Sequence, residues 1–238
     1  MTVTPYADGG SKREQVERMF DRISPRYDLL NRLLSLGIDQ RWRRRVVRRL
    51  RADGVQQLLD VATGTGDLAI MAASAVPRIT GVDISAGMLE QGRRKLKEKG
   101  LEHQVELVQA DGIALPFSDD RFDAVTVAFG VRNFEDLEGG IAEMQRVIRP
   151  GGHLHVLEFS KPRRTPFKEL FRIYFHHILP FIGRLVSRDP AAYTYLPESV
   201  DAFPEGPAFE TILKRCGFTA ISTRPLTGGI ATLYSARK

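Results

Sequence analysis

Three aspartates, each at or just beyond the end of a short apolar run, are the residues of this sequence best suited to binding a small polar ligand. Asp60 lies near the end of the run that starts at Gln57, Asp83 ends the run that starts at Ile79, and Asp111 follows the run that starts at Val105. Runs of this length are typical of buried strands. Because the carboxyl ends of parallel strands meet at one edge of a sheet, the three carboxylates are predicted to line one ligand site.

A glycine-containing turn between the first run and a helical segment indicates which kind of ligand this is. Gly64 and Gly66 allow close approach of the backbone, but Gly64-x-Gly66-x-x-Ala69 also satisfies a loose dinucleotide fingerprint. The pyrophosphate of a dinucleotide would be repelled here by Asp60 and Asp67. S-adenosylmethionine (SAM) instead carries an ammonium and a sulfonium, so the acids favour SAM, although Asp67 could equally satisfy the helix dipole.

The other two acids have natural partners on the same cofactor. Asp83 lies 23 residues after Asp60, where its two oxygens can accept both ribose hydroxyls, while Ser85 is better placed to cap the next helix. Asp111 can accept from the adenine amine. No metal-ligand spacing is present, and none is expected. The predicted cofactor residues are Asp60, Thr63, Gly64, Thr65, Gly66, Asp83, Asp111 and Gly112.

The order of predicted elements indicates an α/β fold. Strands are expected at 57–62, 79–83, 105–109, 122–129 and 153–159, with helices at 67–75 and 137–148 and a turn at Pro150-Gly151-Gly152. This alternation predicts a mostly parallel sheet with right-handed crossovers. Two late runs, 219–224 and 230–236, suit an antiparallel closing pair. The ending favours a Rossmann-like methyltransferase sheet, preceded by N-terminal helices.

The chain is predicted to form one domain, residues 13–238, after a flexible tail of residues 1–12. A helical insertion at about 161–204 contains an aromatic stretch, 165–186, whose apolar positions recur every three or four residues. That apolar face is explained either by core packing or by a lid for a greasy substrate. His176 and His177 are adjacent, so they point to different helix faces and do not form a ligand pair.

Composition limits the location and the partners. The sequence has no apolar run long enough to span a membrane and a single cysteine, Cys216, which predicts a cytoplasmic protein without disulfides. The net charge of +6 is concentrated in the arginine-rich segment 40–51. Nucleic acid, an anionic membrane and a simple solvated helix face are all compatible with such a segment.

Two further segments carry a family resemblance. With Tyr27-Asp28-Leu29-Leu30-Asn31 and the run from Arg146 to Ser160 in view, the chain closely resembles the bacterial demethylmenaquinone and ubiquinone C-methyltransferase family over about residues 12–238. The stretch 35–42 and the segment Tyr193-x-Tyr195-Leu196-Pro197-x-Ser199-Val200-x-x-Phe203-Pro204 are also similar to the family. Most Rossmann-like methyltransferases lack these motifs.

Four positions depart from the family pattern. Leu30 stands where the family usually has Met, and Arg149 where it usually has Lys; both changes are conservative. Asp39 replaces a usual His, which removes an imidazole from that position. Ala128 replaces a Ser that some members use for a cofactor contact.

The resemblance implies C-methylation of an isoprenoid quinol with SAM, most simply demethylmenaquinol to menaquinol; a benzoquinol or both rings remain alternatives. The ring carbon becomes nucleophilic when the adjacent hydroxyl ionises, so a group that stabilises a phenolate is expected. In the loop after the fourth strand, Arg132 is predicted to hold the phenolate or a bridging water, and Asn133 to orient the ring hydroxyl. A structural salt bridge to a surface acid is the alternative for Arg132. Tyr27 is named as completing the pocket on the resemblance alone.

Two other functions compete with this one. A nucleic-acid methyltransferase would use the arginines, but the loop after strand four lacks the Asn/Asp-Pro-Pro-aromatic grip on a flipped base. A non-catalytic SAM-binding or membrane-docking module would have no use for Arg132 and Asn133. The expected partners are therefore a lipid-soluble quinol and, peripherally, the anionic inner face of the plasma membrane, without nucleic acid; a homodimer stays open.

Overall fold

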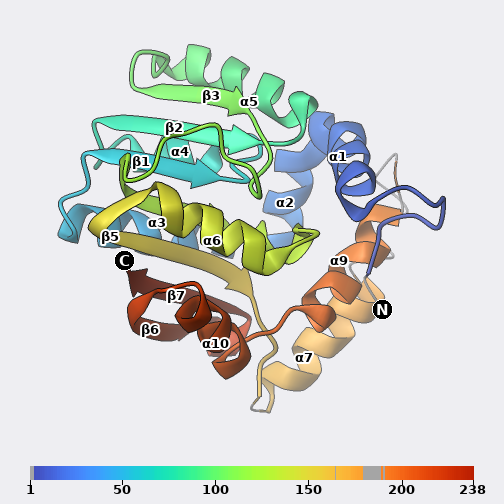
Figure 1. Cartoon of the computed structure of the whole chain (residues 1–238). Helices are drawn as coiled ribbons and strands as arrows, with labels where there is room; N and C mark the ends of the chain where they lie inside the picture. The colour runs from blue at the N-terminus through green and yellow to red at the C-terminus, as the bar shows by residue number, and fades with distance from the viewer. Residues whose placement is uncertain (1–2, 164, 179–188, 190) are drawn as a thin grey trace.

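Five parallel strands, β1 to β5, form the sheet, and their carboxyl ends meet at one edge as predicted. The computed structural model describes residues 3–163, 165–178, 189 and 191–238. Its seven strands follow the order β3-β2-β1-β4-β5-β7-β6, with β7 antiparallel to both of its neighbours (Figure 1). The strands are β1 Gln57–Val61, β2 Arg78–Asp83, β3 Val105–Gln109, β4 Phe122–Ala128, β5 Ile148–Phe159, β6 Thr219–Leu226 and β7 Ala231–Arg237.

Helices precede, connect and follow these strands, as the alternation predicted. The α-helices are α1 Lys12–Ile23, α2 Tyr27–Ser35, α3 Ile38–Ala52, α4 Asp67–Ala72, α5 Ala86–Lys99, α6 Leu137–Val147, α7 Phe167–Ile173, α9 Ala191–Ala202 and α10 Pro207–Arg215. The short 3₁₀ and π segments are η1 Ser24–Arg26, η2 Val131–Asn133, η3 Tyr174–Ile178 and η4 Thr227–Gly229.

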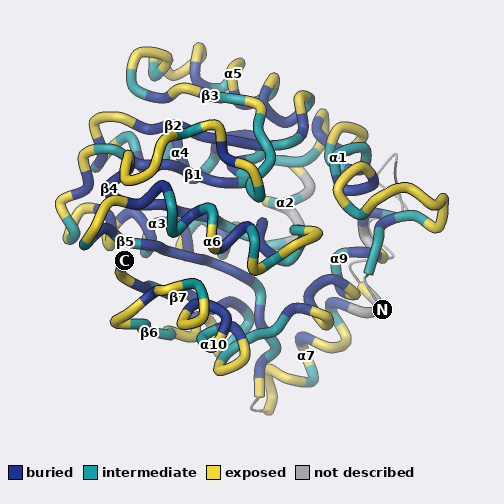
Figure 2. Tube along the Cα trace, viewed as in Figure 1, coloured by how far each residue is buried: buried dark blue, intermediate teal, exposed yellow. Residues whose placement is uncertain are grey.

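Both faces of the sheet are covered, which explains why its central strands are almost continuously apolar. One core cluster joins α6 and α10 to alternate residues of β1, β4 and β5. A second cluster joins α3, α4 and α5 to the opposite face of the sheet. Strands buried on both faces need no polar alternation, and Figure 2 shows them as the buried centre of the molecule.

The predicted turn at Pro150-Gly151-Gly152 lies inside β5. The pairing of β4 with β5 shifts register between Phe122, opposite Ile148, and Ala124, opposite His153. Gly151 has φ of +79°, a conformation that glycine adopts without strain. The chain therefore turns as predicted, but as a bulge within one long strand rather than as a break before it.

The first residues are held against α1. Helix α1 begins with a capping box in which Ser11 and Glu14 satisfy each other's backbone N–H groups. The Tyr6 amide donates to Gln15 Oε1 (2.8 Å), and the Tyr6 hydroxyl donates to Asp189. Residues 3–11 thus make specific contacts where a flexible tail was expected, and their flexibility stays a prediction.

The helical insertion lies beside the N-terminal helices. Phe171 and Phe175 pack with Val200, and α9 lies between α1 and α7 (Figure 1). Leu170 and Ile173 are 61% and 49% exposed, so only part of the apolar face of α7 is used for packing. The rest of the predicted 165–186 helix, from residue 179, lies outside the described residues. Among the residues that are described, no helix has both the length and the apolar character needed to cross a bilayer.

Helix α3 explains one departure from the family and part of the arginine cluster. Asp39 and Arg43 form an ion pair one helical turn apart, and both side chains are only 8% exposed. The Arg43 guanidinium lies over the ring of Phe129, 5.4 Å from its centroid. Asp39 is therefore the internal counter-ion of Arg43. The exposed arginines of this helix are Arg41, Arg44, Arg48, Arg49 and Arg51.

Asp39→Ala should lower the free energy of unfolding by about 3 kcal/mol, because it leaves the Arg43 cation buried without its partner. Urea unfolding measures the loss. Combining Asp39→Ala with Arg43→Met should recover most of it. Arg44→Ala, on the exposed face of the same helix, should change stability by less than about 0.5 kcal/mol. A loss below about 1 kcal/mol in Asp39→Ala would contradict a buried pair.

Candidate active site

A cleft lies at the carboxyl edge of the sheet, under α1 and the start of α2. Its volume is about 740 Å³, including the open mouth, and a smaller hollow adjoins it at the glycine turn. Of the eleven residues predicted for the cofactor and the chemistry, nine line one hollow or both. Those lining residues are Tyr27, Asp60, Thr63, Gly64, Thr65, Asp83, Asp111, Gly112 and Asn133.

 Of the eleven, only Gly66 and Arg132 line neither hollow.

The glycine turn is shaped by a hydrogen bond across the sheet edge. Gly64 has φ of +58°, and its amide donates to Asp83 Oδ2 (2.7 Å). Gly66, with φ of +76°, is the N-cap residue of α4. Both glycines are therefore required by backbone conformation. Gly64 also lines the cleft, whereas the role of Gly66 is to turn the chain into the helix.

Asp83 is held at the end of β2 by two backbone donors. Gly64 N donates to one carboxylate oxygen and Ser85 N to the other (2.9 Å). Ser85 caps α5 by accepting from Met88 N, as predicted. Burial raises the pKa of Asp83 to about 6. Each oxygen of Asp83 keeps acceptor capacity for a ligand hydroxyl, because a carboxylate offers about four lone-pair sites.

Asp60 and Asp67, the two acids of the turn, differ in their surroundings. Asp60 is buried and accepts from the hydroxyls of Thr63 and Thr126 (both 2.7 Å), and burial raises its pKa to about 6. Asp67 forms an ion pair with Lys95. Lys95 also pairs with Asp28 (2.7 Å). The charge that Asp67 was expected to offer a cofactor is therefore partly balanced within the protein, by a lysine that the sequence gave no local reason to single out.

Asp111 faces the cleft from the end of β3 and carries a partner from α1. Arg13 Nε donates to Asp111 Oδ2 (2.6 Å). Lys12, the residue before it, donates to the carbonyl oxygens of Arg132 and Phe134 (3.0 and 2.9 Å). The first turn of α1 thus connects two loops of the site across the cleft mouth. No motif indicated Arg13 or Lys12; only their place at a capped helix start could have drawn attention to them.

Arg132 is buried and paired instead of facing the cleft. Its Nη1 donates to Glu158 Oε1 (2.9 Å) and to the carbonyl oxygen of Phe129, and its Nε donates to Ser199 Oγ (3.3 Å). The Glu158 side chain is fully buried. In this arrangement Arg132 joins η2, β5 and α9, which favours a positioning role. The predicted direct contact with a phenolate stays a prediction.

Asn133 and Tyr27 do face the cleft. Asn133 is buried, and its Oδ1 has no hydrogen-bond partner in the part of the chain that is described. Tyr27 lines both hollows, and burial raises the pKa of its hydroxyl. An unpaired buried acceptor costs free energy unless a ligand donates to it. Asn133 Oδ1 is therefore a ready acceptor for a ligand hydroxyl or amine.

The residues of the cleft fit SAM. Asp83 and Asp111 offer acceptors at two strand ends, Gly64 and Gly112 keep the floor open, and the remaining walls include apolar side chains such as Ile84 and Met88. A Cβ added to Gly112 would lie 2.7 Å from Phe134 Cζ, so this glycine also lets Phe134 close the cleft. Among the described residues, no cluster of three or more His, Cys, Asp or Glu side chains could hold a metal ion.

Comparison with known proteins agrees with this geometry. The model of the ubiE/COQ5 methyltransferase family matches residues 9–238. A demethylmenaquinone methyltransferase of Bacteroides fragilis is 49% identical over 238 residues, 99% of this chain and 97% of the relative. A ubiquinone/menaquinone biosynthesis C-methyltransferase UbiE of Geotalea daltonii is 44% identical, over 95% of this chain and 97% of its own length.

A solved structure supports the fold. The SAM-dependent methyltransferase of Thermotoga maritima superposes with a TM-score of 0.66 at 15% identity, covering 93% of this chain and 99% of its own. At this identity the likeness concerns the fold alone, a class I methyltransferase sheet closed by an antiparallel strand.

SAM affinity should fall by about tenfold when the pH drops from 7.5 to 5, because protonation of Asp83, with its pKa raised to about 6, removes acceptors for the ribose hydroxyls. Titration calorimetry at several pH values measures this. The stability of the free protein depends on pH in the opposite direction. Because the pKa of Asp83 is higher in the folded than in the unfolded state, the contribution of this group to stability is present at low pH and is lost as the pH rises through 6.

Asp83→Asn is the matched variant for this pH profile. Asp60, whose pKa is also raised to about 6, stays in the variant, so the difference between the two profiles isolates Asp83. A wild-type profile that is flat between pH 5 and 7.5, or one that Asp83→Asn leaves unchanged, would remove Asp83 from the binding step.

Proposed function

The chain belongs to the ubiE/COQ5 methyltransferase family, and we propose that it transfers the methyl group of SAM to a ring carbon of an isoprenoid quinol. The observation that carries the proposal is the cleft itself, where acceptors for SAM line one space together with Asn133, whose Oδ1 is unpaired among the described residues. The substrate that we favour is demethylmenaquinol, because the Bacteroides relative is named for that reaction. A benzoquinol is the alternative, since the Geotalea relative is named for both pathways.

In this reaction the protein aligns two partners and excludes water. SAM, when bound, supplies an electrophilic methyl group on its sulfonium. Asp83 and Asp111 hold the adenosine portion, and Asn133 Oδ1 accepts from a ring hydroxyl and so fixes the ring. Val16 and Phe20 of α1 contribute apolar walls. Alignment of this kind is worth several kcal/mol in an in-line displacement.

The ion pair of Arg132 and Glu158 places a cation behind the catalytic loop. The amide of Arg132 also donates to Glu158, at 3.5 Å, so both the side chain and the backbone of Arg132 depend on this acid. The cation can favour ionisation of a quinol hydroxyl held nearby, because charge interactions are strong in a site that excludes water. Tyr27, at the junction of the two hollows, is our second candidate for contact with the ring.

The function is tested by incubating the chain and SAM with a short-chain demethylmenaquinol, a matched demethylated benzoquinol and a transfer RNA, followed by mass spectrometry. We expect a gain of one methyl group on the naphthoquinol. Methylation of the RNA alone would support the nucleic-acid alternative, and SAM binding without any methylated product would support a non-catalytic module.

Arg132→Gln alone should lower stability by about 3 kcal/mol, because Glu158 is left buried without its cation. The informative variant combines Arg132→Gln with Glu158→Gln, which removes both charges and should recover the stability. If the cation assists ionisation, this double variant should lose about 10²-fold in kcat at pH 7 and regain activity as the pH rises.

SAM affinity is the control, and it should stay within about twofold of wild type in the double variant. Full turnover of a stable double variant at neutral pH would reject a role for the Arg132 charge in the chemistry.

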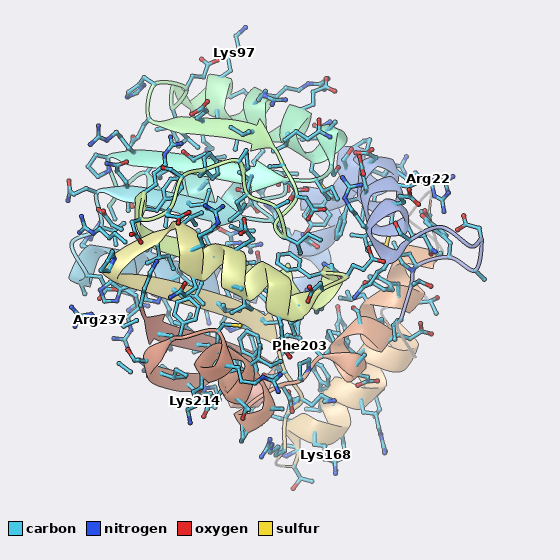
Figure 3. All side chains as sticks on the ribbon, viewed as in Figure 1. Arg22, Lys97, Lys168, Phe203, Lys214 and Arg237 are labelled. Atoms are coloured by element: carbon cyan, nitrogen blue, oxygen red, sulfur yellow. The ribbon has the colours of Figure 1, made fainter. Side chains whose placement is uncertain are left out.

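The substrate's solubility suggests that the protein works at a membrane surface. Helix α7 and η3 present exposed apolar side chains next to basic ones, and Lys168 extends outward from α7 (Figure 3). Apolar insertion combined with attraction to anionic lipid is the usual basis of peripheral binding. The exposed apolar residues of this segment are Phe167, Leu170, Ile173 and Ile178. We assign this segment to contact with an anionic membrane, assisted by the exposed arginines of α3.

Leu170→Ser combined with Ile173→Ser should weaken binding to anionic vesicles at least about tenfold, since two apolar side chains no longer insert. Co-sedimentation measures it. Leu36→Ser, another exposed apolar site outside α7, is the matched control and should have little effect. Arg41→Gln with Arg44→Gln tests the arginine face. Binding that ignores salt and lipid charge would count against the arginines, and equal losses in the Leu36 control would count against α7.

A further inference from the structure

The hydroxyl of Tyr195 is a buried polar group for which the fold provides no partner. Tyr195, in α9, is 3% exposed, and no described residue hydrogen-bonds its hydroxyl. Buried tyrosine hydroxyls normally find one. Tyr234 follows the rule, because its hydroxyl accepts from Gly206 N (2.7 Å). Tyr195 therefore carries a desolvation cost that its own packing does not offset.

The position of Tyr195 connects it with the active site. Its ring packs in one cluster with Val16 and Met88, which also form walls of the cleft. One helical turn further along α9, Ser199 accepts from Arg132 Nε. Burial raises the pKa of Tyr195 to about 12, and the charges of Arg132 and Glu158 both act on its hydroxyl. Tyr195 itself lines neither hollow; it packs behind the cleft walls Val16 and Met88, with its hydroxyl under the influence of the buried ion pair.

A second unpaired atom lies on the loop that α9 contacts. Asn133, in η2 and next to Arg132, lines the cleft, and its Oδ1 is buried without a partner among the described residues. A quinol ring carries two oxygens, each of which can donate and accept. Asn133 Oδ1 can accept a hydrogen bond from a ring hydroxyl, and the Tyr195 hydroxyl can donate one to a ring oxygen. Together the two groups can bind both oxygens of the ring, or can bind the same oxygen as donor and acceptor.

We infer that the hydroxyl of Tyr195 donates a hydrogen bond to a ring oxygen of the aromatic substrate. The inference rests on the proposed function and adds to it a substrate-binding residue from the helical insertion. The bond strengthens as that oxygen ionises, since hydrogen bonds to charged acceptors are about twice as strong as neutral ones. The helical insertion would then contribute to recognition of the substrate ring through Tyr195, in addition to covering the cleft.

Tyr195→Phe tests the inference, because it removes only the hydroxyl. We expect kcat/KM for the quinol to fall about tenfold, the size of one well-placed hydrogen bond, while the Kd for SAM stays within twofold. The melting temperature of the free protein should rise by about 2–4 °C, as an unpaired buried group is removed. Tyr234→Phe is the matched control: it breaks a satisfied hydrogen bond, so it should lower the melting temperature and leave kcat/KM unchanged.

The wild-type protein is assayed first, so that the two proposals fail separately. If it methylates the quinol and Tyr195→Phe keeps kcat/KM within twofold, Tyr195 does not contact the substrate and the inference is overturned alone. A lowered melting temperature in Tyr195→Phe would also overturn it, since the hydroxyl would then have a structural partner such as a bound water. Absence of quinol methylation by the wild type would overturn the proposed function and this inference together.

Discussion

The hydrogen bond from the Gly64 amide to the Asp83 carboxylate (2.7 Å) is the contact on which the site depends. It joins the turn after β1 to the end of β2, so that the two central strand ends form one surface. A left-handed φ at Gly64 is the condition for that amide to point at Asp83. Asp60 then holds the same turn from its other side through the hydroxyl of Thr63. The cleft follows from this arrangement, because α4 and α5 begin where these contacts end.

A second connection closes the site from above, and it is electrostatic. The Arg132–Glu158 pair fixes η2 to β5, Ser199 ties α9 to Arg132, and Lys12 ties α1 to the backbone of the same loop. Segments from the start, middle and end of the chain therefore meet at one buried ion pair. Removing either charge leaves the other uncompensated, so the geometry of the loop and the packing of the covering helices change together. This coupling explains how helices outside the sheet can influence the chemistry at its edge.

The sequence predicted the local features well and the long-range pairs poorly. The β1 and β2 strands, the capping Ser85 and the closing antiparallel pair were predicted, since each depends on neighbouring residues in the chain. Nine of the predicted site residues line the two hollows for the same reason, because strand ends converge by topology. The partners of Asp111 and Asp67 were missed, since Arg13 and Lys95 are far from them in sequence. The long-range partner of Arg132, Glu158, was missed in the same way, although it belongs to a segment that carried the family resemblance.

Most buried polar groups far from the cleft have partners, whereas several in or beside the cleft have none among the described residues. Asp123 accepts from the amides of Gln56 and Gln57, and His155 bridges Asp53 and Ser235. By contrast, burial raises the pKa of both Asp60 and Asp83, and the polar atoms Asn133 Oδ1 and Tyr195 Oη lack partners among the described residues. Of the three other unpaired atoms, Arg43 Nε belongs to a residue that lines the smaller hollow, whereas those on Arg18 and Glu169 lie on α1 and α7 outside the cleft walls. Unpaired atoms are therefore concentrated near the cleft without being confined to it. A site that holds unsatisfied groups in fixed positions has already met the cost of desolvating them, and a ligand that supplies the missing partners recovers that free energy on binding. The same groups that make the free protein less stable therefore make the cleft selective for ligands with hydroxyl and amine groups in matching positions.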